Sequence, residues 1–169
     1  MKSYLAKIDD NTPGPRNDVT PSFADRKAFA QLANDLADPF AGMSVDAVGA
    51  IDALGFIIGT AIAERLDVGV IALRKGGKLP VETIQQTLTD YSGSQKVLEV
   101  RPDLIRPDMR ILIVDEWIET GAQVAAAIAL IERLGATVAG IATICIDGRP
   151  ETETLQQRYA VRQVWDASA

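Results

Sequence analysis

Residues 111–123, which read ILIVDEWIETGAQ, place two carboxylates and a glycine-containing turn directly after an apolar run. Asp115 and Glu116 follow the aliphatic residues, so they would lie at the end of a buried strand. A turn from a strand into a helix leaves backbone N–H groups without partners at the positive end of the helix dipole, where an anion can bind. Thr120 adds a hydroxyl donor, and Gly121 allows close backbone approach. A phosphate is the ligand that this arrangement favours.

The two carboxylates indicate what could carry such a phosphate. Carboxylates accept hydrogen bonds from hydroxyls, so a ribose diol is a suitable partner for Asp115 and Glu116. A carboxylate pair can also stabilise an oxocarbenium-like transition state at a sugar carbon. The alternative is a scaffold turn in which both acids are solvated and Glu119 is a helix N-terminal charge stabilised by the dipole. The turn by itself leaves both interpretations open.

The elements that would position this turn alternate along the chain. Continuously apolar segments that suit buried strands are 45–51, 68–74, 110–116, 137–147 and 160–166. Helical spacing occurs between Thr20 and Pro39 and in 55–66, 121–136 and 151–159. This pattern predicts an α/β fold with a mostly parallel sheet of about five strands, flanked by helices on both faces. Such sheets bind ligands at the carboxyl ends of their strands, which is where the acids would lie.

Composition excludes several functional classes. The chain has 169 residues and a net charge of −6, which suits one domain and argues against a nucleic-acid-binding surface, although RKGGK at 74–78 is locally basic. The absence of histidine excludes Ser-His-Asp and Cys-His nucleophiles and histidine-containing zinc sites. The single cysteine, Cys145, lies in an apolar run and cannot form a disulfide within the chain.

Motifs for other nucleotide sites are also missing. Neither GxGxxG nor GxxxxGK[ST] occurs, which disfavours dinucleotide binding and Walker-type ATP binding. No apolar run approaches 18 residues, and the N-terminus has no apolar signal segment, so we expect no membrane association and a cytoplasmic location.

Several segments together resemble the type I phosphoribosyltransferases, and most closely the adenine phosphoribosyltransferases. ILIVDEWIETG resembles the phosphoribosyl pyrophosphate signature of that family. The other similar segments, in the family's order, are DVTPSFADRKAFAQLANDLADPF, VDAVGAIDALGFIIGTAIAERLDVGVIALRKGGKLP and IERLGATVAGIATICID. The resemblance extends from about residue 12 to residue 147. It implies a type I phosphoribosyltransferase core with a small N-terminal hood formed by residues 1–19.

The resemblance assigns roles to the acidic turn. Asp115 and Glu116 would hold the ribose 2′- and 3′-hydroxyls. The 5′-phosphate would be wrapped by Glu119, Thr120, Gly121, Ala122 and Gln123. Many adenine enzymes have Ala-Thr-Gly-Gly-Thr in this loop, so this chain lacks the second glycine and the last hydroxyl, which the Gln123 amide could replace as a donor. The acid at position 119 resembles the hypoxanthine-guanine branch, where such an acid is implicated in proton handling at the base.

The leaving pyrophosphate would be bound by two further segments. The basic residues are Arg74, Lys75 and Lys78, and the second segment is the loop Asp52, Ala53, Leu54 and Gly55. In the family this loop contains a cis peptide that does not precede proline. Leu54 stands where an arginine is usual, so a guanidinium is missing while backbone contacts remain possible. Mg²⁺ would be bound through the pyrophosphate substrate, and the sequence does not indicate which residues would ligate it.

The lid and the base site are the remaining parts. Residues 75–97 match the family's flexible catalytic lid, and Asp90 lies near its catalytic acid. Lid closure would exclude water from the reacting carbon. The base would contact Arg16, Asn17 and Asp18, with Arg16 at the place of an aromatic platform.

The expected reaction is transfer of 5-phosphoribose from phosphoribosyl pyrophosphate to a purine base, and adenine is the favoured base. The 169 residues would form a single-domain enzyme, and the resemblance implies that this enzyme is a homodimer. Two alternatives remain open: a non-catalytic module that senses phosphoribosyl pyrophosphate or a nucleotide, and a phosphoribosyltransferase for another base.

Overall fold

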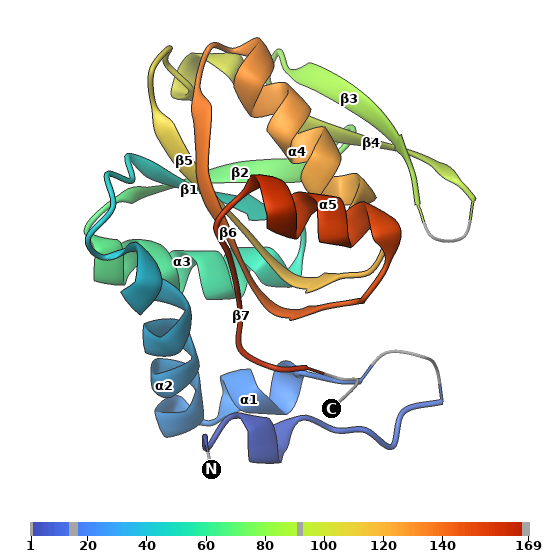
Figure 1. The fold of residues 1–169 in the computed structure, drawn as a ribbon. Helices are drawn as coiled ribbons and strands as arrows, with labels where there is room; N and C mark the ends of the chain where they lie inside the picture. Colours follow the sequence, from blue (N-terminus) through green and yellow to red (C-terminus); the bar gives the residue numbers. More distant parts are fainter. Residues whose placement is uncertain (1, 14–16, 91–92, 167–169) are drawn as a thin grey trace.

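A computed structural model describes residues 2–13, 17–90 and 93–166. Within these ranges, one seven-stranded sheet has the order β3-β4-β2-β1-β5-β6-β7 (Figure 1). The strands are β1 (Ala47–Ile51), β2 (Gly69–Lys75), β3 (Ile84–Thr89), β4 (Gln95–Val100), β5 (Arg110–Ile118), β6 (Thr137–Ile146) and β7 (Val161–Gln163). The α-helices are α1 (Thr20–Ala24), α2 (Arg26–Ala37), α3 (Leu54–Leu66), α4 (Ala122–Arg133) and α5 (Pro150–Arg158). Short 3₁₀ helices span Leu5–Lys7, Asp38–Phe40 and Pro102–Leu104.

The five strands predicted from apolar runs form the parallel part of the sheet. β1 pairs in parallel with β2 and β5, β5 with β6, and β6 with β7. This confirms the predicted α/β fold with a mostly parallel sheet. None of the helices in the described ranges is both long and apolar enough to cross a membrane.

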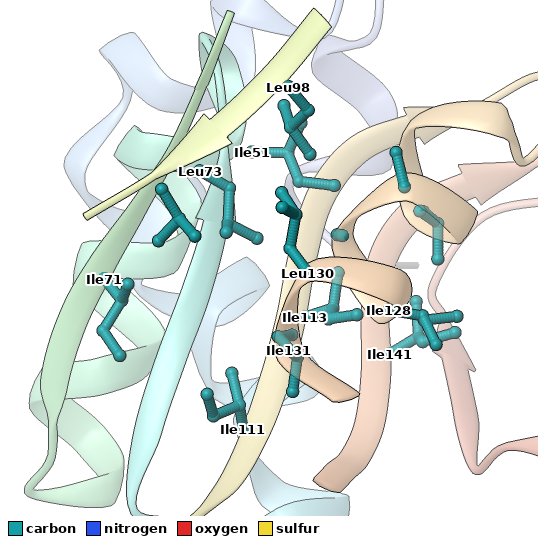
Figure 2. Close-up of a cluster of buried hydrophobic side chains, with 14 of the residues drawn as sticks. Ile51, Ile71, Leu73, Leu98, Ile111, Ile113, Ile128, Leu130, Ile131 and Ile141 are labelled. Atoms are coloured by element: carbon teal, nitrogen blue, oxygen red, sulfur yellow. The ribbon is translucent and has the colours of Figure 1, made fainter. Parts of the chain in front are cut away.

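Each face of the sheet is covered by its own cluster of apolar side chains. Along β5, Ile111 and Ile113 belong to the cluster under α4, whereas Leu112 and Val114 belong to the cluster under α2 and α3. This alternation follows from the two-residue period of a strand. Figure 2 shows the first cluster, in which side chains of the central strands meet Ile131 and its neighbours on α4. Burial on both faces explains why these strands are apolar at every position.

The segment 75–97, which was expected to be a flexible lid, contains regular structure. β3 and β4 pair antiparallel in register from Ile84↔Val100 to Thr89↔Gln95, and β4 joins the sheet through β2. Leu88 and Leu98 are buried in the cluster under α4, so the hairpin buries apolar area that the sequence analysis did not assign to it. The base of the hairpin therefore packs against the core of the protein.

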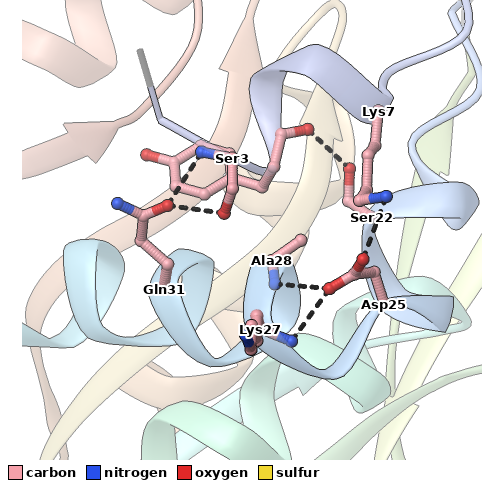
Figure 3. Close-up of polar contacts among 8 residues, drawn as sticks. Ser3, Lys7, Ser22, Asp25, Lys27, Ala28 and Gln31 are labelled. Carbon is pink, nitrogen blue, oxygen red and sulfur yellow. Dashed lines mark hydrogen bonds and ion pairs between the residues drawn. The ribbon is translucent and has the colours of Figure 1, made fainter.

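The predicted helix after Thr20 is two helices with a break at Asp25. The Asp25 side chain accepts hydrogen bonds from the N–H groups of Lys27 (2.9 Å) and Ala28 (3.0 Å), and its other oxygen pairs with Lys7 at 3.0 Å (Figure 3). Thr20 is the first helical residue of α1, and the Asp18 carboxylate accepts its N–H at 2.9 Å.

The N-terminal arm is fixed to the body by a buried tyrosine. The Tyr4 hydroxyl donates to Asp35 Oδ2 at 2.7 Å, and Lys2 Nζ lies 2.9 Å from the same oxygen. Ser22 Oγ donates to the Tyr4 carbonyl at 2.9 Å, and Ser3 contacts Gln31 of α2 (Figure 3). Burial, followed by the hydrogen bond to Asp35, raises the pKa of the Tyr4 hydroxyl above its ordinary value. The arm and α1 lie on the side of the sheet at which β5 and β6 end (Figure 1).

Candidate active site

The strand β5 carries the two acids and continues beyond them. It was expected to end at residue 116, but it pairs with β6 as far as Ile118↔Ile146. Asp115 is 3% exposed, and its Oδ1 accepts the N–H of Glu116 at 2.9 Å. Glu116 is half-buried. The two carboxylates therefore differ in burial, although they are adjacent in sequence.

The turn after β5 has the backbone that a phosphate site requires. Gly121 has φ 76°, in the left-handed region that favours glycine, and α4 begins at the next residue. Thr120 Oγ1 accepts the N–H of Ala122 at 3.3 Å. The N–H groups of Gln123 and Val124 belong to the first turn of α4, where a helix offers them no acceptor of its own. These donors and the helix dipole make the turn suitable for an anion.

The helix α5 packs against this turn. A Cβ atom added at Gly121 would lie 2.9 Å from Leu155 Cδ1 and 3.6 Å from Thr152 Cγ2. Thr152 is fully buried and donates to the carbonyl oxygen of Asp147, at the end of the strand β6. The helix after β6 thus fixes the turn after β5, a contact that the sequence analysis did not predict.

A small cavity lies between Asp115, the turn and the β3–β4 hairpin, and Glu116 is not among the residues that line it. Its volume is about 30 Å³, enough for about one water molecule. The residues that line it are Leu88, Asp90, Asp115, Trp117, Ile118, Glu119, Thr120, Gly121, Ala122, Gln123 and Val124. The structure therefore brings together Asp90, Asp115 and the whole predicted phosphate turn, residues that are up to 33 positions apart in the sequence.

A larger cleft of about 660 Å³ continues from this cavity beneath the hairpin. The two share Leu88, Asp90 and Gln123, and the cleft extends to Lys75 and Gly77 at the end of β2. Asp90 lies at the tip of β3, where its carboxylate accepts the Ser94 N–H at 3.0 Å and lies 3.7 Å from Lys96 Nζ. The cleft is large enough for a small ligand that reaches from the turn to the basic end of β2.

The loop 52–55 lies between Asp115 of β5 and Arg74 of β2. The peptide between Asp52 and Ala53 is cis, as the resemblance implied for this loop, and α3 begins at Leu54. Gly55 lies against the backbone of β5, where an added Cβ would approach the Val114 carbonyl oxygen to 2.8 Å and the Asp115 Oδ1 atom to 3.6 Å. The loop thus adjoins the buried acid directly.

The basic residues of β2 are held at the other end of this loop. Arg74 Nε lies 3.4 Å from Asp52 Oδ2, and the guanidinium lies over the Phe56 ring at 5.9 Å. Arg74 Nη1 also donates to the Lys78 carbonyl at 3.2 Å. The Lys75 and Lys78 side chains are exposed. Three cations therefore gather within five residues beside the cleft.

The comparison with known families identifies this arrangement. The phosphoribosyl transferase domain family matches residues 22–166. The chain belongs to the phosphoribosyltransferase family. The adenine phosphoribosyltransferase of Jannaschia sp. is 40% identical over 142 residues, which are 82% of this chain and 79% of that protein.

Solved structures extend this similarity to the whole phosphoribosyltransferase fold. The adenine phosphoribosyltransferase of Rhodothermus marinus has a TM-score of 0.86 and 31% identity, with 96% of each chain covered. The enzyme of Saccharomyces cerevisiae, solved with an imino-altritol bisphosphate and adenine, has a TM-score of 0.81 and 25% identity, with 95% of each chain covered. The resemblance inferred from the sequence segments is confirmed.

The predicted base site of this phosphoribosyltransferase is described only in part. Arg16 lies outside the described residues, as does Tyr91 of the lid. Asn17 and Asp18 are half-buried, and the Asp18 backbone pairs with that of Asp9 at 2.8 and 2.9 Å. The Asp18 carboxylate also accepts the N–H and hydroxyl of Thr20, so both the backbone and the side chain of Asp18 already have partners within the arm. The assignment of the base to residues 16–18 stays a prediction.

The sequence analysis missed one large side chain in the cavity of this phosphoribosyltransferase. Trp117 lies two residues after Asp115 and lines the same cavity, and its side chain belongs to the apolar cluster under α2 and α3. Its Nε1–H donates to Asp147 Oδ1 at 2.8 Å, and its ring packs against Trp165 with centroids 5.5 Å apart. An aromatic residue between the predicted site acids and the glycine-containing turn was the signal that could have identified it.

Proposed function

We propose that this phosphoribosyltransferase transfers 5-phosphoribose from phosphoribosyl pyrophosphate to adenine and releases pyrophosphate. One observation carries the proposal: Asp115, the phosphate turn 119–123 and the hairpin residue Asp90 line a single cavity that opens toward the basic end of β2. The name of the Jannaschia relative and the adenine in the yeast structure support adenine as the base.

The phosphate and ribose positions of the proposal follow from the turn. The 5′-phosphate would accept hydrogen bonds from the backbone N–H groups of 120–123, at the positive end of α4. The ribose hydroxyls would donate to Asp115 and Glu116, which lie immediately before that turn. Both carboxylates would also stabilise the positive charge that develops on the sugar ring in an oxocarbenium-like transition state.

The bond changes require a group that accepts a proton. The bond between C1 of the ribose and the pyrophosphate oxygen breaks, its electron pair leaves with pyrophosphate, and adenine N9 forms the new bond to C1. The proton on N9 must then pass to a base. Asp90 and Glu119 are carboxylates that line the cavity, and we propose them for this step.

The pyrophosphate would be held by cations of the chain and by Mg²⁺. Arg74, Lys75 and Lys78 supply positive charge beside the cleft, and the backbone of 52–55 lies next to them. Mg²⁺ prefers oxygen ligands and commonly binds through one or two carboxylates together with substrate phosphates and water. The oxygen donors of Asp52, Asp115 and Glu116 fit that preference, and the bound ion would neutralise charge on the leaving group.

The proposal also covers the organisation of the enzyme. The chain would act as one catalytic domain with residues 1–19 as its hood and 75–97 as its lid, in a cytoplasmic homodimer. Ile57 and Val70 are 43% and 40% exposed, which supports a partner surface near β2.

The reverse reaction offers a direct test. Adenosine monophosphate, Mg²⁺ and pyrophosphate should yield free adenine and phosphoribosyl pyrophosphate, both of which mass spectrometry can identify. Omission of pyrophosphate is the control, because simple hydrolysis would release adenine without it. Adenine release that does not depend on pyrophosphate, or no release at all, would contradict the proposal.

A further inference from the structure

Glu99 is a buried carboxylate outside the cavity residues that the sequence analysis and the proposed mechanism use. It lies on β4 and is 1% exposed. Its Oε1 atom accepts the backbone N–H groups of Lys78 at 2.8 Å and Leu79 at 2.9 Å. Its Oε2 atom accepts from Thr83 Oγ1 at 3.2 Å and from Gln85 Nε2 at 3.3 Å. A buried charge with this many donors is held in place by them and holds them in turn.

The charge state of Glu99 is fixed by the same contacts. Burial would raise the pKa of the carboxyl, but the hydrogen bonds donated by the backbone N–H groups of residues 77–79 outweigh burial and lower it to about 2. Glu99 is therefore an anion throughout the range in which enzymes work.

The turn that Glu99 holds contains Lys78 and directly follows Arg74 and Lys75 at the end of β2. Gly76 N–H donates to the Val97 carbonyl at 2.8 Å, so the turn starts against β4. The Lys78 carbonyl accepts from Arg74, which in turn lies 3.4 Å from Asp52 of the cis-peptide loop. A continuous set of contacts thus runs from Glu99 through the turn to the loop beside Asp115.

We propose that Glu99 is a positioning residue for the pyrophosphate group. Its carboxylate accepts hydrogen bonds from the backbone N–H groups of the 77–79 turn, so that the turn keeps one conformation. The Lys75 and Lys78 ammonium groups then remain available to the substrate. This inference rests on the proposed function, because it concerns the leaving group of that reaction. It also links the β3–β4 hairpin to the pyrophosphate side, since Glu99 belongs to the hairpin itself.

The test is Glu99→Gln, with binding of Mg²⁺–pyrophosphate and of adenosine monophosphate measured separately by calorimetry. The amide replaces one accepting oxygen with an NH₂ group that faces donors, so the turn must shift. Pyrophosphate affinity should fall about tenfold or more, as for a lost hydrogen bond to a charged group, while nucleotide affinity changes less than about twofold. In turnover, KM for phosphoribosyl pyrophosphate should rise more than kcat falls.

The matched control is Glu64→Gln, an exposed acid near the end of α3, which should leave both affinities unchanged. Thr83→Val provides a milder variant if Glu99→Gln fails to fold. It removes one donor to Oε2 and should weaken pyrophosphate binding about two- to fivefold, with nucleotide binding retained.

The outcomes separate this inference from the proposed function. Equal pyrophosphate affinity in wild type and both variants, or an equal loss of nucleotide and pyrophosphate affinity, would overturn the role of Glu99 alone. A wild-type protein that binds neither ligand would overturn the proposed function and the inference with it.

Discussion

At the scale of single residues, the two acids of β5 have different surroundings. Asp115 is buried beside Gly55 and accepts the next backbone N–H, whereas Glu116 is half-buried. A rigid buried carboxylate can orient one hydroxyl of a diol, and the more accessible one can adapt to the other.

The first prediction concerns this pair. Asp115→Asn with Glu116→Gln keeps the shapes and removes both charges. Charged hydrogen bonds contribute roughly 1.5–3 kcal/mol each, so affinity for adenosine monophosphate should fall at least about tenfold. The asparagine Oδ1 can still accept the Glu116-position N–H, so the urea midpoint should stay close to that of wild type. Calorimetry and urea unfolding measure the two quantities, and unchanged nucleotide affinity would refute the ribose assignment.

The second prediction concerns pH and Glu99. Its folded-state pKa of about 2 lies below the ordinary value of 4.5. A lowered carboxyl pKa contributes stability that is fully present above the unfolded value and is lost as pH falls through the folded value. The difference in unfolding free energy between wild type and Glu99→Gln should therefore be constant above about pH 5 and shrink progressively toward pH 3. Urea unfolding across this range measures it, and a difference that does not depend on pH would contradict the assignment.

Some residues of the candidate site could be predicted from the sequence, and others could not. The acids and the turn were predictable because an apolar strand, two acids and a glycine stand in one continuous segment. Glu99 and Trp117 were missed because their partners are far away in the chain. A single acid within the apolar run VLEV was a signal for Glu99, since a buried charge needs partners.

At the scale of elements, the strands and helices that position the site divide into predictable and unpredictable ones. β1, β5 and β6 were predictable because strands buried on both faces are largely apolar. β2 and β7 were also predicted, although they are less buried and β7 contains two polar residues. β3, with the sequence IQQTLT, exposes alternate residues, so its polar positions resembled a loop. The break at Asp25 was hidden because the flanking helices continue the same apolar spacing.

The third prediction concerns the turn before α4. Gly121→Ala places a Cβ 2.9 Å from Leu155 in a residue with φ 76°. The left-handed backbone alone costs an alanine roughly 1–2 kcal/mol, so the unfolding free energy should fall by at least about that amount. The turn should also shift and weaken nucleotide binding. Gly42→Ala is the control, because nothing lies within 4 Å of its added Cβ. Equal unfolding free energy and equal nucleotide affinity in the two variants would contradict this prediction.

The fourth prediction concerns the β3–β4 hairpin as a lid. β3 is an edge strand whose outward residues are exposed, although α4 contacts it and Arg133 donates to the Gln85 carbonyl at 3.1 Å. Without ligand, the amides of β3 should exchange hydrogen faster than those of β5 in the centre of the sheet. Nucleotide with Mg²⁺–pyrophosphate should slow the exchange. Mass spectrometry of peptides measures both rates, and equal protection of β3 and β5 without ligand would argue against a moving lid.

At the scale of the whole molecule, two apolar clusters hold one sheet, and the carboxyl ends of its central strands carry the candidate site. β1 leads to the cis-peptide loop, β2 to the basic turn and β5 to the glycine-containing turn, so three neighbouring strands supply the three segments to which the proposed function assigns the substrate. The hairpin and the N-terminal arm are additions to this core. This division explains why the fold and the glycine-containing turn were predictable from local sequence, whereas the assignment of a base site to the arm stays a prediction.

The choice of base tests the account most directly. The protein should be incubated with phosphoribosyl pyrophosphate, Mg²⁺ and adenine, hypoxanthine or guanine, with the nucleotide products identified by mass and kcat/KM compared. A 6-oxo purine reverses the donor and acceptor pattern at the edge that an adenine site reads, which leaves buried partners unpaired, so adenine should exceed both other bases by about two orders of magnitude or more. Preferential turnover of a 6-oxo base would assign Glu119 to a hypoxanthine-guanine type of reaction. Tight nucleotide binding without turnover of any base would contradict catalysis altogether and indicate a sensor.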